Sequence, residues 1–166
     1  MQSVVPRVIA LAKLHITDIL VEPTKRGANL FNSDRRILAF LVEGVVFDIM
    51  TTFDKRYLCI EICDEAALAL KKVGEQLQRN EDAKFWSPIA TNLFKARLSE
   101  KTTFFDHDGN ALSTVSPNTR IKCLVRSDRL WRLDIDKVPR FGMTFEVTQV
   151  VAVEVVPIKC LIVADA

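Results

Sequence analysis

Apolar and polar residues alternate along much of the chain, which is the pattern of β-strands with one buried face. The clearest example is the stretch 143–155. One of its faces carries Met143, Phe145, Val147, Val151, Val153 and Val155, and the other carries Thr144, Glu146, Thr148 and Glu154. Similar runs of β-branched and aliphatic residues lie at 8–21, 37–49, 57–62, 120–126, 129–133 and 158–163. The pattern therefore predicts a mainly β protein.

One segment has helical spacing instead. After Asp64, a candidate N-cap, the sequence DEAALALKKVGEQLQRN places Leu70, Val73 and Leu77 on one side of a helix near 64–80. Two readings are open further on, because Ser87-Pro88 suits the start of a second short helix while LFKARL suits the start of a strand.

Glycine and proline mark the expected turns. Asp108-Gly109 separates two strand-like runs and predicts a tight hairpin, since this dipeptide suits the positive φ angles of primed turns. Pro117-Asn118 marks the next turn, and Gly44 is expected to interrupt the second run as a turn or bulge. An antiparallel β domain with one inserted helix follows, closed as a small barrel or sandwich.

Size and composition fit one ordinary globular domain over residues 1–166. The chain has a mass of 18.8 kDa and a net charge of +2, with 49% apolar and 27% charged residues. The charge is uneven, because residues 95–140 hold ten Lys/Arg against six Asp/Glu. Arg7 and Lys13 interrupt the apolar N-terminal stretch, so we expect neither a signal peptide nor a membrane span.

The inventory of reactive groups does not suggest an enzyme. The five glycines are isolated, so no phosphate-binding loop is present, and neither histidine lies in a nucleophile motif. Cysteines occur at Cys59, Cys63, Cys123 and Cys160, mostly in apolar strand-like runs. We expect reduced core thiols of an intracellular protein, with no metal, no cofactor and no catalysis.

The stretch RLWRLDIDKVPRFGMTF combines arginines with a tryptophan. On a strand, Arg129 and Trp131 share one face. An indole offers a flat surface on which any base can stack, and guanidinium groups can hold the phosphates between stacked bases. This combination favours binding of single-stranded nucleic acid, although a core position for Trp131 is an equal alternative.

The preceding strand RIKCLVR supports the same hypothesis. Its alternation places Arg120, Lys122 and Arg126 on one side and the apolar residues of 121–125 on the other. A second basic cluster flanks Phe31 in a polar loop, for which simple solvation is the alternative, and Lys55-Arg56-Tyr57 is a third short example. The candidate nucleic-acid-binding residues are Lys25, Arg26, Phe31, Arg35, Arg36, Lys95, Arg97, Arg120, Lys122, Arg126, Arg129, Trp131, Arg132 and Arg140.

From residue 57 onward the order of these elements resembles the OB-fold single-stranded-DNA-binding proteins of T-odd phages and large eukaryotic DNA viruses. The likeness runs through YLCIEI, the helix, FWSPIATNLFKARL, TTFFDHDGNAL, RIKCLVR, the aromatic centred on Trp131, and FGMTFEVTQVVAVEV, covering about 57–156. The resemblance implies an OB-like antiparallel barrel that coats single-stranded DNA in replication or recombination, often as a dimer. It also implies replication proteins as partners and a site of action in a viral replication compartment or the host nucleus or cytoplasm.

The C-terminal sequence departs from that family. Its members commonly end in an acidic tail, whereas this chain has PIKCLIVADA, whose apolar residues 158–163 would be hazardous as an exposed strand edge. We therefore expect a homodimer that covers this edge. Two other functions remain open: a structural or adaptor protein of a virion or replication complex that binds an acidic protein partner, and RNA binding, since bases stack alike in both nucleic acids.

Overall fold

The computed structural model describes residues 9–15, 18–24, 27–32, 36–79, 84–86, 89–90 and 92–155. These residues form one eleven-stranded sheet, a 3-10 turn η1 (Leu11–Lys13) and one helix, α1 (Asp64–Arg79). The strands are β1 (Ile9–Ala10), β2 (Ile19–Thr24), β3 (Gly27–Asn32), β4 (Ala39–Thr52), β5 (Lys55–Glu61), β6 (Lys84–Trp86), β7 (Ile89–Ala90), β8 (Leu93–Phe105), β9 (Ala111–Leu112), β10 (Thr119–Ile135) and β11 (Val138–Val155). The predicted mainly β fold with one inserted helix is confirmed.

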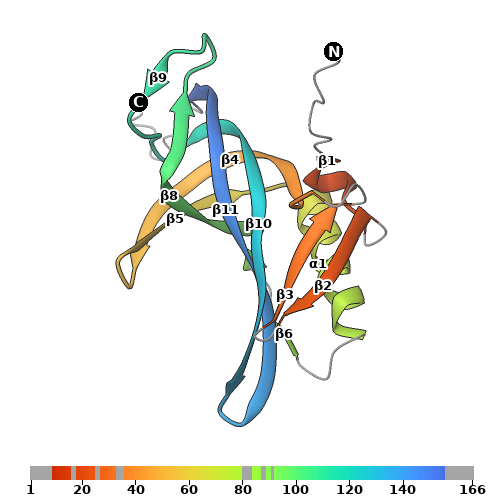
Figure 1. Ribbon diagram of the computed structural model, residues 1–166. Helices are drawn as coiled ribbons and strands as arrows, with labels where there is room; N and C mark the ends of the chain where they lie inside the picture. Colours follow the sequence, from red (N-terminus) through yellow and green to blue (C-terminus); the bar gives the residue numbers. More distant parts are fainter. Residues whose placement is uncertain are drawn as a thin grey trace, which may run out of the picture.

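Five of the strands close into a barrel (Figure 1). β4 pairs with β5, β5 with β8, β8 in parallel with β11, and β11 with β10. β10 then returns to β4, because the first half of β4 pairs with β10 and its second half with β5. A Greek-key barrel of five strands with this connectivity is an OB barrel, so the OB-like prediction is also correct.

Gly44 has a different role from the one predicted. It lies inside β4, which continues through it without a turn. A Cβ atom at this position would lie 2.3 Å from the carbonyl oxygen of Glu61, so only glycine lets β4 and β5 approach this closely. The bulge lies instead between Val46 and Asp48, where the register of β4 against β5 shifts.

The alternation predicted for β11 holds only in its first part. Met143, Phe145 and Val147 are buried as expected, but Val150 is buried and Val153 is exposed. Against β10, Val125 pairs with Val147 and Leu124 with Gln149, so Thr148 is one extra residue in β11 and moves every later side chain to the opposite face. The predicted inward face is therefore wrong beyond Val147.

Two more strand predictions need correction. The run 8–21 is not one strand, because η1 separates β1 from β2. The runs 120–126 and 129–133 belong to one long strand, β10. Of the two readings left open after Ser87-Pro88, the strand is correct and the short helix is wrong, since residues 89–90 form β7 and residues 93–105 form β8.

Both predicted turns are present. Asp108 and Gly109 lie in the loop between β8 and β9, with Gly109 at φ 84°. This loop is longer than a two-residue hairpin turn, and the Asp106 carboxylate accepts hydrogen bonds from the backbone N–H groups of Asp108 and Asn110. Asn118 occupies the other turn with φ 66°.

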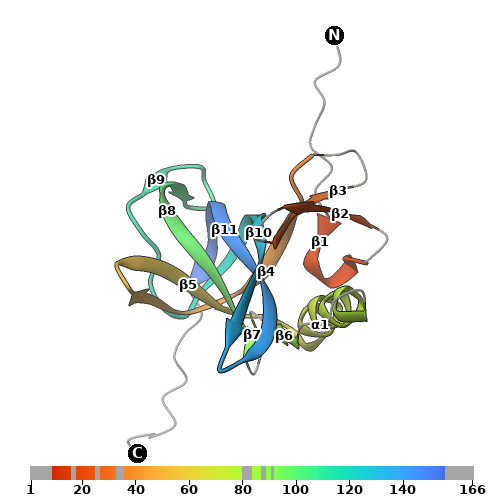
Figure 2. The ribbon, with the colours of Figure 1, turned by 60° about the horizontal axis from the view of Figure 1, so that its bottom comes forward.

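Helix α1 packs one face against the rest of the molecule, beside η1 and β6 (Figure 2). Leu70, Val73 and Leu77 are buried, as their spacing predicts. Cys63, rather than Asp64, precedes the first turn: its sulfur lies 3.4 Å from the backbone nitrogen of Ala66. The predicted cap is thus displaced by one residue.

The barrel interior is aromatic and tightly packed. The rings of Phe40 and Phe145 meet edge to face with centroids 5.2 Å apart, and Phe94 lies against both. Such pairs add to the stability that burial of the rings supplies. Cys123 is also buried here, and burial raises the pKa of its thiol to about 12.

The prediction of core thiols holds for two of the three cysteines in the described residues. Cys59 and Cys123 are buried, but Cys63 is exposed at the start of α1. Its position between β5 and the helix places it at the surface of the barrel rather than inside. Cys160 lies outside the described residues.

Two β-hairpins project from the same end of the barrel (Figure 1). One is the β4–β5 hairpin, which turns at Phe53-Asp54. The other is a long ribbon formed by β10 and β11, which turns at Asp136-Lys137 and is flanked by β3 and β6. The space between these two hairpins is the setting of the candidate site.

Candidate nucleic-acid interface

A groove of about 230 Å³ lies between the β4–β5 hairpin and the β10–β11 ribbon. β5 contributes Lys55 and Tyr57, and β8 contributes Lys95 and Arg97. The opposite wall consists of Asp128, Met143, Thr144 and Phe145. Three cations and one carboxylate line the groove, so it favours an anionic ligand. We call it the basic groove.

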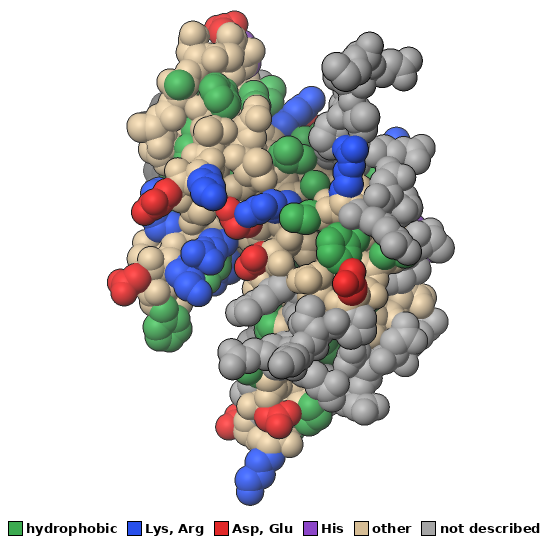
Figure 3. Space-filling model, in the orientation of Figure 1, with side chains coloured by type: hydrophobic (Ala, Val, Ile, Leu, Met, Phe, Trp, Pro, Cys, Tyr) green, Lys and Arg blue, Asp and Glu red, His purple; other side chains and the backbone are tan. Residues whose placement is uncertain are grey.

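The pairing of β5 with β8 explains why its side chains converge. Tyr57 lies opposite Arg97, and Cys59 lies opposite Lys95. Alternation turns Leu58, Ile60 and Ala96 into the core, and the groove residues of β5 and β8 take the outer face. Figure 3 shows Lys and Arg side chains gathered on this face, with a hollow beside them.

The groove contains an aromatic ring beside a cation. The Nζ atom of Lys95 lies 4.4 Å from the centre of the Tyr57 ring, within cation–π range. Tyr57 is half-buried and is the single tyrosine of the chain. A partly exposed ring with cations in the same groove can accept a stacked base while phosphates are held nearby.

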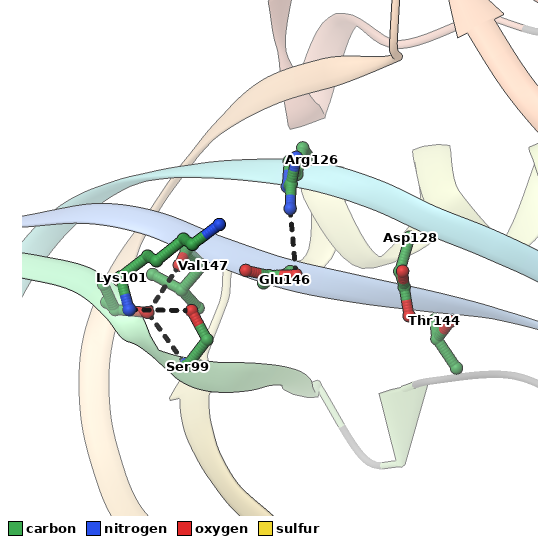
Figure 4. Close-up of polar contacts among 8 residues, drawn as sticks. Ser99, Lys101, Arg126, Asp128, Thr144, Glu146 and Val147 are labelled. Atoms are coloured by element: carbon green, nitrogen blue, oxygen red, sulfur yellow. Dashed lines mark hydrogen bonds and ion pairs between the residues drawn. The ribbon is translucent and has the colours of Figure 1, made fainter.

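Glu146 lies at the centre of the neighbouring part of this face (Figure 4). Its Oε2 atom is 3.2 Å from Nη2 of Arg126, and Arg97 is its neighbour on the parallel strand β8. Burial acts to raise the pKa of Glu146, but hydrogen bonds from Ser99 and Arg126 and the charges of both arginines hold that pKa below its usual value. The carboxylate is therefore ionised and keeps Arg126 engaged.

The outer face continues from the groove onto the ribbon. Along β11, the half-buried Thr144 and Glu146 alternate with the buried residues Met143, Phe145 and Val147, and Gly142 precedes them on the same face but is buried. Trp131 lies opposite Gly142 on β10, and its ring occupies the space that a side chain there would need: a Cβ at Gly142 would lie 2.4 Å from Cζ2 of Trp131. The indole is half-buried, so part of the ring packs on the protein and part of it is accessible to solvent.

The basic row on β10 has the predicted faces. Arg120, Lys122 and Arg126 are exposed, while Ile121, Cys123 and Val125 are buried. The row is nevertheless divided. Arg120 and Lys122 line a separate groove, which shares no lining residue with the basic groove, and Lys122 pairs with Glu43 at 3.7 Å. Of the three, Arg126 alone is connected to the basic groove: it pairs with Glu146, whose neighbour on β8 is the groove residue Arg97.

The remaining candidates are scattered. Phe31 lies in strand β3 rather than in a loop, because β3 pairs with β2, and the side chain is half-buried. Arg36 is exposed, and its backbone N–H donates to Asn32. Arg140 is half-buried on β11. Lys25, Arg26 and Arg35 lie outside the described residues, as do the side chains of Arg129 and Arg132.

The candidate set includes neither of the two residues that β5 contributes to the groove. Lys55 and Tyr57 occur in the short KRY motif, whose alternation of cations with an aromatic ring was the available signal. The motif alone does not identify a site, because the other two cations of the groove, Lys95 and Arg97, come from the neighbouring strand β8. Glu146 was placed on the outer face of its strand, but nothing in the sequence paired it with Arg126.

Comparison with known proteins reveals a structural likeness. The fold resembles a phage single-stranded-DNA-binding protein. The solved structure of the single-stranded DNA-binding protein from bacteriophage Enc34 aligns with a TM-score of 0.50 and 10% identity, covering 81% of this chain and 90% of the phage chain. A C-terminal truncation of that protein aligns with a TM-score of 0.47 and 8% identity, over 82% of this chain and 95% of the other. At such low identity the likeness concerns the fold.

Sequence comparison adds no relative. Neither the protein-family models nor the curated proteins include a match to this chain. Two structural observations concern the described residues alone. No helix among them is long and apolar enough to cross a membrane. No three of their His, Cys, Asp or Glu side chains come together in a way that could hold a metal ion.

Proposed function

We propose that this protein binds single-stranded DNA without catalysis, along the outer face that joins the basic groove to the ribbon. In replication or recombination it would coat exposed strands. The binding is independent of sequence, because stacking and phosphate contacts use features that every nucleotide shares.

The observation that carries the proposal is the convergence of Tyr57, Lys95 and Arg97 on the β5–β8 face of an OB barrel. These are the second and third strands of the barrel, whose face and adjoining loops bind oligonucleotides in other OB folds. The groove offers one aromatic ring with cations beside it, the combination that single strands require. A rigid duplex presents no free base to such a ring.

The residues of the face have separate roles in this proposal. Tyr57 stacks a base, while Lys55 and Arg97 hold the phosphates before and after it. Trp131, supported by Gly142, offers a second stacking surface on the ribbon. Arg126 reaches a phosphate once it exchanges its partner Glu146.

The test is fluorescence polarisation with labelled single-stranded DNA, duplex DNA and single-stranded RNA of equal length at two salt concentrations. Single-stranded DNA should bind more tightly than duplex, and Tyr57→Ala should weaken it by about 1–3 kcal/mol, the usual value for one stacked base. Arg97→Glu should also weaken binding and should flatten the plot of log affinity against log salt by about 0.7 for the lost phosphate contact.

The matched control is Lys71→Glu, a charge reversal at an exposed cation on α1, which lines no part of the groove. It should change the affinity little. Equal binding of duplex and single strand, or an equal loss in the control variant, would contradict the proposal. Tighter binding of RNA than DNA would support the RNA alternative, and failure to bind either would leave the adaptor function.

We further propose that the protein acts as a homodimer and recruits replication proteins. The dimer prediction rests on the apolar stretch 158–163, which lies outside the described residues. The physical reason is unchanged: an apolar strand edge in water tends to pair with another strand.

A further inference from the structure

The turn between β4 and β5 holds a phenylalanine in an unfavourable position. Phe53 is 92% exposed, the highest value among the exposed large apolar residues of the described chain. Its φ angle is 51°, and that of Asp54 is 62°. Two consecutive residues in the left-handed region form a tight primed turn, in which Asn-Gly or Asp-Gly is preferred because a bulky side chain is strained there.

Exposure and strain coincide at this residue. A lone exposed apolar side chain is common and needs no special explanation. Here, however, the ring gains almost no burial and also occupies a strained backbone position. Within the described residues, the other non-glycine residues with positive φ are Asp54, Asn92, Asn118, Asp136 and Lys137, all of them polar. A costly and solvent-exposed phenyl ring points to a contact outside the folded chain.

The location of the turn indicates the nature of that contact. Lys55 and Tyr57 follow the turn on β5, and both line the basic groove. The β4–β5 hairpin and the ribbon project from the same end of the barrel (Figure 1), with the hollow of Figure 3 between them. Phe53 therefore lies in the turn that directly precedes the part of β5 lining the groove, two residues before Lys55 and four before Tyr57.

We propose that Phe53 is an additional base-stacking residue, which extends the binding surface beyond the groove to the tip of the β4–β5 hairpin. The inference rests on the proposed function and names a contact within the same site. The ring offers an apolar face without hydrogen-bonding groups, so it accepts any base. Lys55, two residues further along the hairpin, lines the basic groove, and its cation suits the backbone of a nucleic-acid strand better than the surface of an apolar protein partner.

The substitution Phe53→Asn separates folding from binding, because Asn tolerates positive φ while it removes the ring. The variant should melt at a higher temperature than the wild type and bind single-stranded DNA about 5- to 150-fold more weakly. Its salt dependence should be unchanged, since no phosphate contact is lost. Phe53→Trp should retain wild-type affinity, because it keeps an aromatic face.

Two control variants test the turn and the loss of apolar surface. Asp54→Gly relaxes the same turn and keeps the ring, so it should raise the melting temperature without weakening binding. Leu68→Gln removes an exposed apolar side chain on α1, and it should leave both measurements nearly unchanged.

Three outcomes would overturn the inference, and they differ in what else fails. Wild-type affinity in Phe53→Asn, while Tyr57→Ala binds weakly, removes Phe53 from the site and leaves the proposed function standing. A change from dimer to monomer on sedimentation of Phe53→Asn would identify the ring as a contact between copies. Absence of single-strand binding in the wild type would remove the proposed function together with the inference.

Discussion

The ammonium nitrogen of Lys95 lies 4.4 Å from the centre of the Tyr57 ring, so in the free protein a cation covers one face of the aromatic ring in the basic groove. A base that stacks on this face must displace the ammonium group. The displaced lysine then lies within the same groove as the incoming phosphates, with Lys55 and Arg97. Binding would thus exchange a cation–π contact for a stacked base and a phosphate contact.

Lys95→Met tests this exchange, since methionine keeps an unbranched apolar side chain and removes the charge. We expect weaker binding of single-stranded DNA at low salt and a slope of log affinity against log salt that is flatter by about 0.7. At high salt the affinities should converge, because the lost contact is electrostatic and the ring is now uncovered. Lys72→Met on the exposed side of α1 is the control. An unchanged slope would show that Lys95 contacts no phosphate.

The cysteines should differ in reactivity. Cys63 is exposed, whereas Cys59 and Cys123 are buried, so a thiol reagent should modify Cys63 rapidly in the native protein and the other two only after unfolding. Mass spectrometry of partially labelled protein identifies the modified peptide. Rapid native labelling of Cys123 would contradict its position in the core.

Cys123 should also make folding stability depend on alkaline pH. Burial raises the pKa of its thiol from 9.0 to about 12 in the folded protein. Above pH 9 the unfolded chain therefore loses this proton first, and stability falls as the pH rises from about 9 to about 12. Urea unfolding at pH 7 and pH 10 should show a smaller alkaline loss in Cys123→Ala than in the wild type. Equal losses would place the thiol in a more hydrated environment.

Much of the fold follows from the alternation of apolar and polar residues, because a closed barrel buries one face of each strand. Alternation no longer predicts which side chains are buried where the backbone departs from a regular strand. The shift between Val147 and Gln149 reverses the later part of β11, and no residue in that stretch is a recognisable signal for it. The sequence marks Gly44 as an interruption of its strand, but the reason for a glycine there is the carbonyl of Glu61, which belongs to another strand.

The site was harder to predict for the same physical reason. Arg120, Lys122 and Arg126 lie on the expected face of β10, but the first two pair with Val45 and Glu43 of β4 and line a different groove with them. The basic groove instead joins residues far apart in the chain, such as Tyr57 and Lys95. Local alternation gives the face of a residue, and strand pairing decides its neighbours.

Glu146 should weaken binding of nucleic acid in the wild type. Its carboxylate holds Arg126 at 3.2 Å and adds a negative charge to a surface proposed to receive phosphates. Glu146→Gln should therefore bind single-stranded DNA about 1.5- to 5-fold more tightly at low salt, the size of a screened charge interaction. Glu43→Gln, which affects the pair with Lys122 in the other groove, is the matched control. Weaker binding in Glu146→Gln would mean that the carboxylate positions Arg126 for its phosphate.

The same carboxylate should affect stability in acid. Its pKa is lower in the folded protein than the usual 4.5, so it stabilises folding above about pH 4.5 and loses that effect as the pH falls through the folded value. The difference in urea midpoint between wild type and Glu146→Gln should shrink from pH 7 to pH 3. A constant difference would show that the pKa of Glu146 is not lowered by folding.

Trp131 and Gly142 provide the final prediction, because their packing allows stacking and core roles to be separated. The Trp131 ring fills the space above Gly142, so Gly142→Ala, whose Cβ would lie 2.4 Å from Cζ2, must displace the ring. If Trp131 is a stacking platform, Trp131→Ala should weaken single-strand binding by about 1–3 kcal/mol with the salt slope nearly intact. Gly142→Ala should weaken binding in the same direction, since the displaced ring no longer lies on the outer face.

Melting and binding of the same two variants decide between the roles. A fully buried tryptophan would cost about 3–5 kcal/mol of folding stability on replacement by alanine. Because the Trp131 indole is only half-buried, we expect a smaller loss, and the folded variant should remain the major species at room temperature. Weak binding by this folded protein would support the platform. A much lower melting temperature in both variants, with normal affinity in the fraction that stays folded, would instead mean that the indole stabilises the ribbon and does not contact the base.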